Sequence, residues 1–273
     1  MPERKITRSF HDWAEKVGYS KLLFLSILTA GHLVVHWYTN LLSLVLPFIR
    51  TDLNLTNVEV GTIITAQMGI SSGLVIISGF VADSFRRKGA AIVSGSIISF
   101  GIAFFIIGMS PSYGWTLVGA GMVGVGTALW HPAALGALSI CFPDHRGMAL
   151  SVHGMGASVG DAIGPIIVGA LIVMADWKLA LEFHLLPSLI IAILLWVGLG
   201  MMRNVSQERT NLKVYVASMK AMFVYRQTTI VMISNTLVTM GRLSLLAFLP
   251  IYISETLDYS AFSLGIYLAL LYV

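Results

Sequence analysis

Seven long apolar runs constrain this chain more than any other feature of its sequence. A bilayer has a hydrocarbon core of roughly 30 Å, which a helix of about 20 apolar residues can cross. A helix also satisfies its own backbone hydrogen bonds in lipid. We therefore predict an all-α membrane protein with spans near residues 22–49, 57–82, 89–110, 114–140, 147–174, 179–202 and 228–252, and a partial span at 261–273.

The amino-acid composition fits the same class. Hydrophobic residues make up 56% of the 273 residues and charged residues 11%, whereas soluble domains carry about 25% charged residues. The formal net charge of +4 does not indicate a nucleic-acid partner, because the cations cluster in the segments between apolar runs. Cys141 is the sole cysteine, which excludes a disulfide within the chain.

The cations also predict the orientation in the membrane. With a cytoplasmic N-terminus, 14 of the 17 Lys and Arg residues fall in the first 21 residues or after the second, fourth and sixth runs. Of the other three, Arg50 and Lys178 lie on the opposite side and Arg242 lies within the seventh run. Because positive charge gathers on the cytoplasmic side, we expect a multi-pass protein of the plasma membrane with a cytoplasmic N-terminus.

The spacing of the runs predicts four segments. Residues 1–21 form a polar and basic cytoplasmic leader, and residues 22–202 form a bundle of six transmembrane helices. The longest polar interval, residues 203–227, is expected to be a cytoplasmic linker. Residues 228–273 then begin a second bundle with one helix and part of another, so we expect the sequence to be a C-terminally truncated fragment of a longer protein.

The turn after the second run carries the first motif, Gly-Phe-Val-Ala-Asp-Ser-Phe-Arg-Arg-Lys. It resembles the loop after helix 2 of the major facilitator superfamily, Gly-x-x-x-Asp-basic-x-Gly-basic-basic. It departs from that pattern at Ser84 and Arg86 and matches it at Gly79, Asp83, Arg87 and Lys88. The resemblance implies a secondary transporter with six-helix bundles, each of two inverted three-helix repeats, and a substrate site near the membrane midplane.

In that family this loop takes part in conformational switching, so the resemblance implies a gating role here. Asp83 would lie at the C-terminal end of a helix, where the helix dipole disfavours an anion. It would need a partner, such as a neighbouring arginine or the N-terminus of another helix. The gating candidates of the loop are Gly79, Asp83, Arg86, Arg87 and Lys88.

Ionisable residues inside apolar runs are costly and are therefore candidates for function. His32, His36 and Asn40 recur every four residues in the first run, so they share one helix face. The fourth run contains His131 before a proline, and the fifth contains Asp161 near its middle. We predict that Asp161, His32, His36 or His131 takes up and releases a coupling proton.

Each of these residues also has a structural interpretation. A membrane histidine can simply bond a neighbouring carbonyl, and Asp161 could form a buried ion pair with Arg242. The pair of His32 and His36 suits a transition metal, but no cysteine or acidic cluster accompanies it in the sequence. We therefore predict no metal site and no cofactor, with the proton as the coupling ion.

The fifth run adds a glycine pattern. Gly156, Gly160 and Gly164 recur every four residues and precede Pro165, which gives a smooth face for close helix contact. The order Gly-x-x-x-Gly-Pro-x-x-x-Gly from Gly160 resembles the helix-5 motif of drug–proton antiporters in the superfamily. By that resemblance Gly160, Gly164 and Pro165 are gating candidates.

These features together resemble the fosmidomycin-resistance-like group of the superfamily. The resemblance covers most of the first 175 residues, through Gly31-His32, His36, His131-Pro132 and the Gly160–Pro165 segment. It departs from the group at three positions. Trp37 and Ala133 stand where an acidic residue is expected, and Asp161 stands where a small neutral one is expected.

The resemblance implies proton-driven efflux of a small organic compound by alternating access. The alternatives are proton-coupled uptake of an organic anion or sugar, with Arg242 binding the anion, and a membrane sensor that transports nothing. No spacing of nucleophile and base indicates an enzyme. Expected partners are a small-molecule substrate and the lipid bilayer, with a monomer as the family default. The substrate-pocket candidates are Trp37, Tyr38, Asn40, Gln67, Trp130, His153 and Arg242.

Overall fold

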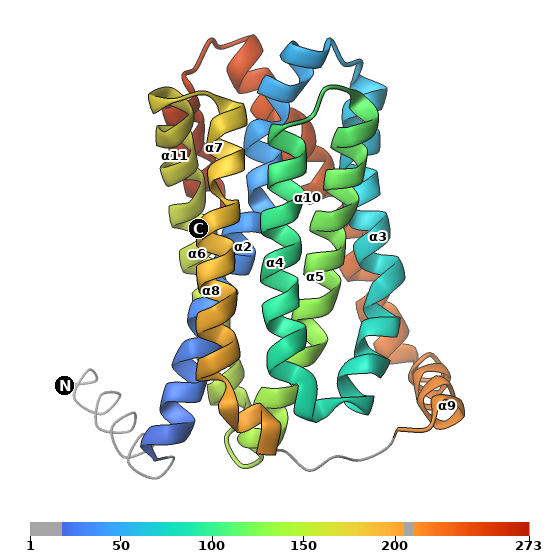
Figure 1. Cartoon of the computed structure of the whole chain (residues 1–273). Helices are drawn as coiled ribbons and strands as arrows, with labels where there is room; N and C mark the ends of the chain where they lie inside the picture. Colours follow the sequence, from blue (N-terminus) through green and yellow to red (C-terminus); the bar gives the residue numbers. More distant parts are fainter. Residues whose placement is uncertain (1–17, 205–209, 273) are drawn as a thin grey trace, which may run out of the picture.

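The computed structural model describes residues 18–204 and 210–272, and this part of the chain consists of helices joined by short turns, with no strand (Figure 1). Seven spans of the described chain are long and apolar enough to cross a membrane. The predicted all-α membrane fold is therefore confirmed. The predicted leader, residues 1–21, lies almost wholly outside the described residues.

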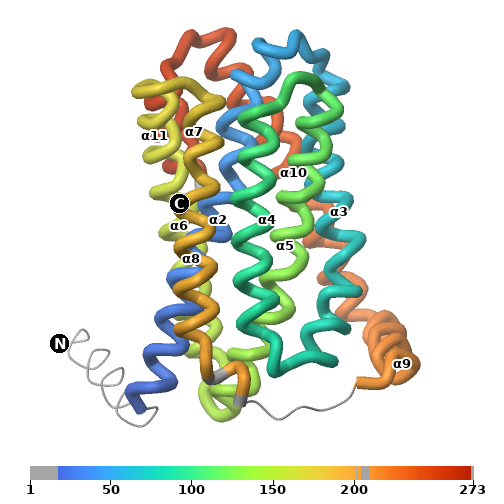
Figure 2. Tube along the Cα trace, viewed as in Figure 1, coloured from blue at the N-terminus to red at the C-terminus, as the bar shows by residue number. Residues whose placement is uncertain are grey.

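Six spans form the first bundle. Figure 2 shows the first helix, α2, running obliquely through this bundle from one end to the other. A 3-10 turn, η1, covers Arg86–Lys88 at the predicted gating loop. The helices are α2 (Tyr19–Leu53), α3 (Asn57–Ser84), α4 (Gly89–Gly108), α5 (Tyr113–Cys141), α6 (Arg146–Met174) and the pair α7 (Trp177–Phe183) and α8 (Leu185–Gly198).

Local sequence signals set several helix ends. Asn54 ends α2 in the left-handed conformation, with φ of 50°, which asparagine tolerates better than most residues. Thr56 and Glu59 then form a capping box, in which the Glu59 side chain accepts from the Thr56 N–H at 2.8 Å. Asp176 caps α7 by accepting from the Leu179 N–H at 2.9 Å.

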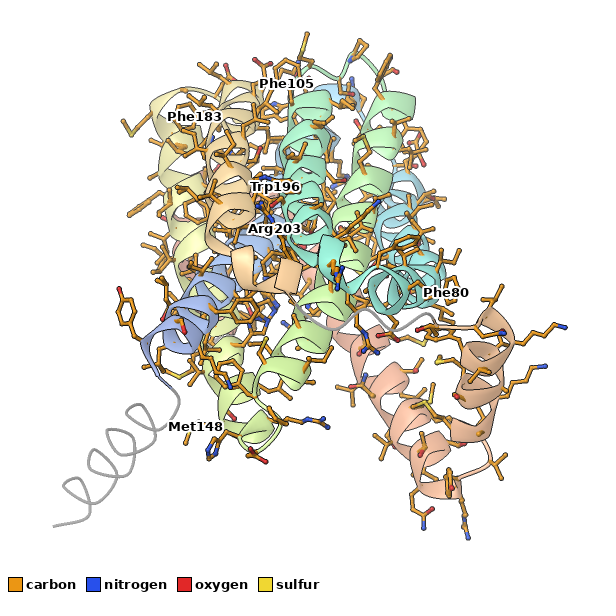
Figure 3. All side chains as sticks on the ribbon, turned by 60° about the horizontal axis from the view of Figure 1, so that its bottom comes forward. Phe80, Phe105, Met148, Phe183, Trp196 and Arg203 are labelled. Carbon is orange, nitrogen blue, oxygen red and sulfur yellow. The ribbon has the colours of Figure 1, made fainter. Side chains whose placement is uncertain are left out.

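The sixth span differs from the single helix predicted over residues 179–202. It breaks between α7 and α8 at His184, whose N–H bonds the Leu181 carbonyl three residues back at 3.0 Å. Pro187 explains the break, because it lacks the N–H that would bond Phe183 in a continuous helix. The Arg203 guanidinium lies over the Trp196 ring just beyond α8, 4.9 Å from its centroid (Figure 3).

The segment predicted as a polar linker, residues 203–227, contains a helix, α9 (Leu212–Met222). The Asn211 side chain begins it by accepting from the Lys213 N–H at 2.8 Å. Tyr215 of α9 reaches back to the first bundle and donates to the Ile76 carbonyl of α3 at 3.2 Å. The linker thus includes an element that docks against a transmembrane helix.

Two further helices, α10 (Arg226–Glu255) and α11 (Ala261–Tyr272), begin the second bundle. They meet the first bundle at the end where α2 joins α3, and there Arg50 of α2 pairs with Glu255 of α10. At the opposite end, α9 and the first turns of α10 stand apart from the first turn of α6 at Met148 (Figure 3). The two bundles therefore touch at one end and diverge at the other.

Candidate functional site

The site is built on close contact between α2 and α6. A Cβ atom added to Gly156 would overlap the Thr29 carbonyl of α2, and one added to Gly160 would overlap the Leu33 carbonyl. One turn further on, a Cβ at Gly164 would lie 3.0 Å from the Trp37 ring. The glycine face predicted from sequence thus lies directly on α2, and backbone meets backbone along it.

This contact places Asp161 against the polar face of α2. The Asp161 carboxylate is 2.9 Å from His36 Nδ1 and also accepts a hydrogen bond from the Asn40 side-chain amide. The residue is only 8% exposed, and a buried carboxylate needs such partners because its desolvation is costly. Asp161 thus contacts His36 and Asn40 rather than forming the ion pair with Arg242 that the sequence suggested. Arg242 is exposed on α10.

Three more histidines surround this pair. The His32 ring stands edge-on to His36, with centroids 4.7 Å apart, and to His131 of α5, at 5.4 Å. His153 of α6 stacks on the His32 ring, with centroids 4.1 Å apart and an interplanar angle of 2°. We call His32, His36, His131 and His153 the histidine cluster; α2, α5 and α6 all contribute to it.

The proton-coupling candidates of the sequence thus lie together, and each histidine among them bonds an oxygen through Nδ1. His32 Nδ1 is 2.9 Å from the His153 carbonyl, and His131 Nδ1 is 3.3 Å from the Thr127 carbonyl. The Nε2 atom of His32 is buried without a hydrogen-bond partner. Such atoms are uncommon in folded proteins.

The six predicted pocket residues other than Arg242 divide into two groups. Asn40 and His153 belong to the site, and Trp130 stacks beside His32 at 6.4 Å and fills the space over Gly31. The other group serves helix packing. Tyr38 is buried against Phe100 and Phe104 and donates to the His184 carbonyl at 2.8 Å, Gln67 donates to the Thr39 carbonyl at 3.3 Å, and Trp37 covers Gly164.

A cavity between the bundles was not foreseen from the sequence. It has a volume of about 420 Å³ and lies between α3 and α10. Its walls are mostly apolar, with two methionines, and no motif marks them because apolar residues are expected at every position of such helices. Lining residues include Ile64, Thr65, Met68, Met240, Leu243 and Phe248.

The predicted gating loop lies where α3 ends, as expected for Asp83. Asp83 and Arg86 line a small recess together with Pro132 and Gly136 of α5. Tyr215 of α9 lies over Gly79, where an added Cβ would be 2.6 Å from its hydroxyl oxygen. Partial desolvation, together with the negative charge of Asp83, raises the pKa of Tyr215.

Comparison with known proteins agrees with this architecture. The sequence profile of the Major Facilitator Superfamily matches residues 28–273. The chain belongs to this superfamily. Its members are multi-pass membrane transporters of small molecules and not enzymes. The predicted superfamily, fold class and non-enzymatic nature are therefore confirmed.

Individual relatives refine the comparison. Puromycin resistance protein pur8 of Streptomyces alboniger is 30% identical over 172 residues, which is 62% of this chain and 34% of pur8. The fosmidomycin resistance protein of Escherichia coli (strain K12) is 22% identical over 148 residues, 54% of this chain and 36% of that protein. The chain thus matches only about a third of the length of these two curated relatives.

A solved structure shows the same fold. A bacterial homolog of the human lysosomal transporter Spinster, in an inward-facing and unoccupied conformation, superposes with a TM-score of 0.76 at 16% sequence identity. The match covers 93% of this chain and 60% of the other.

Proposed function

We propose that the protein is a secondary active transporter that exports a small organic compound by alternating access. The observation that carries this proposal is the buried Asp161–His36–Asn40 contact inside a bundle of the Major Facilitator Superfamily. Two relatives named as antibiotic resistance proteins support export as the direction.

The orientation is part of the proposal. The end of the bundle that carries Arg86, Arg87, Lys88 and Arg146 is expected to face the cytoplasm, because positive charge gathers there. The bundles then touch at the extracellular end and diverge at the cytoplasmic end, which corresponds to an inward-facing state. The gating candidates at Gly79–Lys88 would lie at the open end and would act when it closes.

Proton entry is the proposed driving force, with Asp161, His32, His36 and His131 as the candidate residues. Support for it is their placement together within the membrane-spanning bundle, where ionisable groups commonly serve proton pathways. The cavity between α3 and α10, with its apolar lining, suits a largely apolar organic compound.

Transport into inside-out membrane vesicles tests this proposal. Puromycin is the first compound to measure, because one relative is a puromycin resistance protein, followed by a panel of amphipathic compounds. With an acidic interior, an exporter driven by proton antiport accumulates the compound inside the vesicle. Release of preloaded compound under the same gradient would instead indicate proton-coupled uptake, and the absence of any flux would contradict transport.

Asp161→Asn tests the role of this carboxylate in transport. Asp144→Asn, in the exposed turn before α6, is the matched control. Loss of a charge-assisted hydrogen bond costs roughly 1.5–3 kcal/mol, so we expect gradient-driven accumulation to fall about tenfold or more. The control should stay near the wild-type rate. Equal rates in both variants would remove Asp161 from the mechanism.

A further inference from the structure

We propose that His32, His36 and His131 form a binding site for one divalent first-row transition-metal ion, such as Zn²⁺. One ring nitrogen from each of the three residues lies within 4.8 Å of the other two. The prediction of no metal site rested on the His32–His36 pair alone, and the folded chain adds a third imidazole from α5. This inference goes beyond the proposed function and does not depend on it.

The hydrogen bonds of the three rings fix which nitrogen is available. A backbone carbonyl can only accept, so the Nδ1 atoms of His32 and His131 carry the hydrogen in their bonds to His153 and Thr127. His36 Nδ1 faces the Asp161 carboxylate at 2.9 Å. In a neutral imidazole with its hydrogen on Nδ1, the Nε2 lone pair remains free for a metal.

This arrangement matches the general design of metal-binding histidines. Such a histidine usually donates its other N–H to a carboxylate or a backbone carbonyl, which fixes the ring and strengthens the ligand. His36 has a carboxylate in that position, and His32 and His131 have carbonyls. The buried and unpartnered Nε2 of His32 gains an explanation, because a bound ion would satisfy it.

The geometry requires only small movements. Three nitrogens bound tetrahedrally to one zinc ion at about 2.0–2.1 Å lie roughly 3.3 Å apart, and the present separations reach 4.8 Å. Binding of one ion therefore requires the nitrogens to draw together by up to about 1.5 Å. Three protein ligands also leave a fourth position for water or another ligand.

Access and charge also fit a cation. His36 and His131 are partly exposed whereas His32 is buried, so two of the three ligands are accessible to an ion. Asp161 supplies a negative charge next to His36 and offsets part of the cation's charge in a region that disfavours unpaired charge. Imidazole ligands suit Zn²⁺, Ni²⁺ and Cu²⁺, and oxygen-preferring Mg²⁺ should bind far more weakly.

Binding of Co²⁺ and Zn²⁺ to the protein, purified in lipid nanodiscs without a polyhistidine tag, tests the proposal. We expect one ion per chain by calorimetry, with a visible Co²⁺ absorption spectrum typical of low coordination number that Zn²⁺ abolishes. No transport substrate or proton gradient is present, so failure of this test and failure of the transport proposal are distinguishable. Wild-type protein that shows no saturable one-ion binding would overturn the site.

Variants locate the ion. His36→Gln and His131→Gln change partly exposed residues, and His145→Gln, in the exposed α5–α6 turn, is the matched control. Each ligand variant should weaken binding by more than about 100-fold, and Asp161→Asn by about 10–100-fold as an outer-sphere partner. The control should bind as wild type does. Equal affinity of His131→Gln and His145→Gln would contradict the site, with thermal melting used to confirm that each variant is folded.

Discussion

The helix α6 makes two close contacts that look alike and differ in consequence. Toward α2, within the first bundle, Gly156 and Gly160 lie on backbone carbonyls, and polar side chains meet beside them. Toward α11, in the second bundle, Gly169 lies on the Ala261 carbonyl, and Gly265 lies on the Pro165 carbonyl. The first contact assembles the histidine cluster, whereas the second joins the two bundles, which the proposed alternating access would separate.

The largest effect should come from blocking the first contact with Gly160→Leu. The new side chain would meet the Leu33 backbone, which cannot yield as a side chain can. Overpacking of this kind costs about 1–3 kcal/mol, occasionally more, and it would also separate Asp161 from His36. We expect a lower melting temperature in nanodiscs together with loss of metal binding.

Gly154→Leu is the control on the same helix, because nothing lies within 4 Å of a Cβ at that position. It should leave the melting temperature and metal binding nearly unchanged. If both leucine variants melt alike, close packing of α2 on α6 does not hold the site together.

A smaller effect is expected from the second contact, tested with Gly265→Leu. The side chain would meet the Pro165 carbonyl of the other bundle. It should push the bundles apart at the end where α2 joins α3, while the histidine cluster stays intact. A cost of about 1.4 kcal/mol changes the ratio of the two states about tenfold. Spin labels on the exposed residues Val58 and Leu257, in a Cys141→Ser background, report the distance across this end.

Here the control is Gly241→Leu on α10, where a Cβ meets nothing within 4 Å. The two contacts of α6 differ as proposed if Gly265→Leu lengthens the label distance and preserves metal binding. Loss of metal binding in Gly265→Leu would mean that the site depends on the second bundle.

The smallest effect concerns the ion pair between Arg50 and Glu255, which joins the bundles at the same end. Both side chains are partly exposed, at 24% and 37%, and exposed pairs contribute only about 0–1 kcal/mol. Arg50→Gln should therefore change the ratio of the two states by at most about fivefold. The distance between the spin labels reports this ratio. High salt should reproduce part of the shift in the wild type.

Lys178 and Asp52 form a comparable pair at 2.7 Å within the first bundle. Lys178→Gln removes a similar surface charge without touching the second bundle, so it should leave the distances unchanged. An equal shift in both variants would indicate a general charge effect.

The sequence predicted the helices well because each apolar run must cross the same thickness of lipid. It also placed His32, His36 and Asn40 on one face, since they recur every four residues. The same periodicity shows why Tyr38 is not in the site. At 100° per residue, Tyr38 points about 200° away from His36, which is toward α4 and the sixth span.

The partner of Asp161 could not be predicted, because it depends on how α2 and α6 are rotated about each other. The glycine face indicated that α6 would pack closely against another helix, but it did not indicate which one. The sequence lacks the acidic residue expected beside His36, where it has Trp37, and has Asp161 where a neutral residue is expected. The fold brings these two departures together, since Asp161 supplies a carboxylate to His36 from another helix.

The proposed transport mechanism depends on the contact between His36 and Asp161. The most direct measurement is the initial rate of substrate transport in proteoliposomes for His36→Gln beside His145→Gln. Loss of the charge-assisted bond, roughly 1.5–3 kcal/mol, predicts a fall of about tenfold or more for His36→Gln, with the rate of His145→Gln close to wild type. Equal rates for the two variants would show that transport does not depend on the contact between His36 and Asp161.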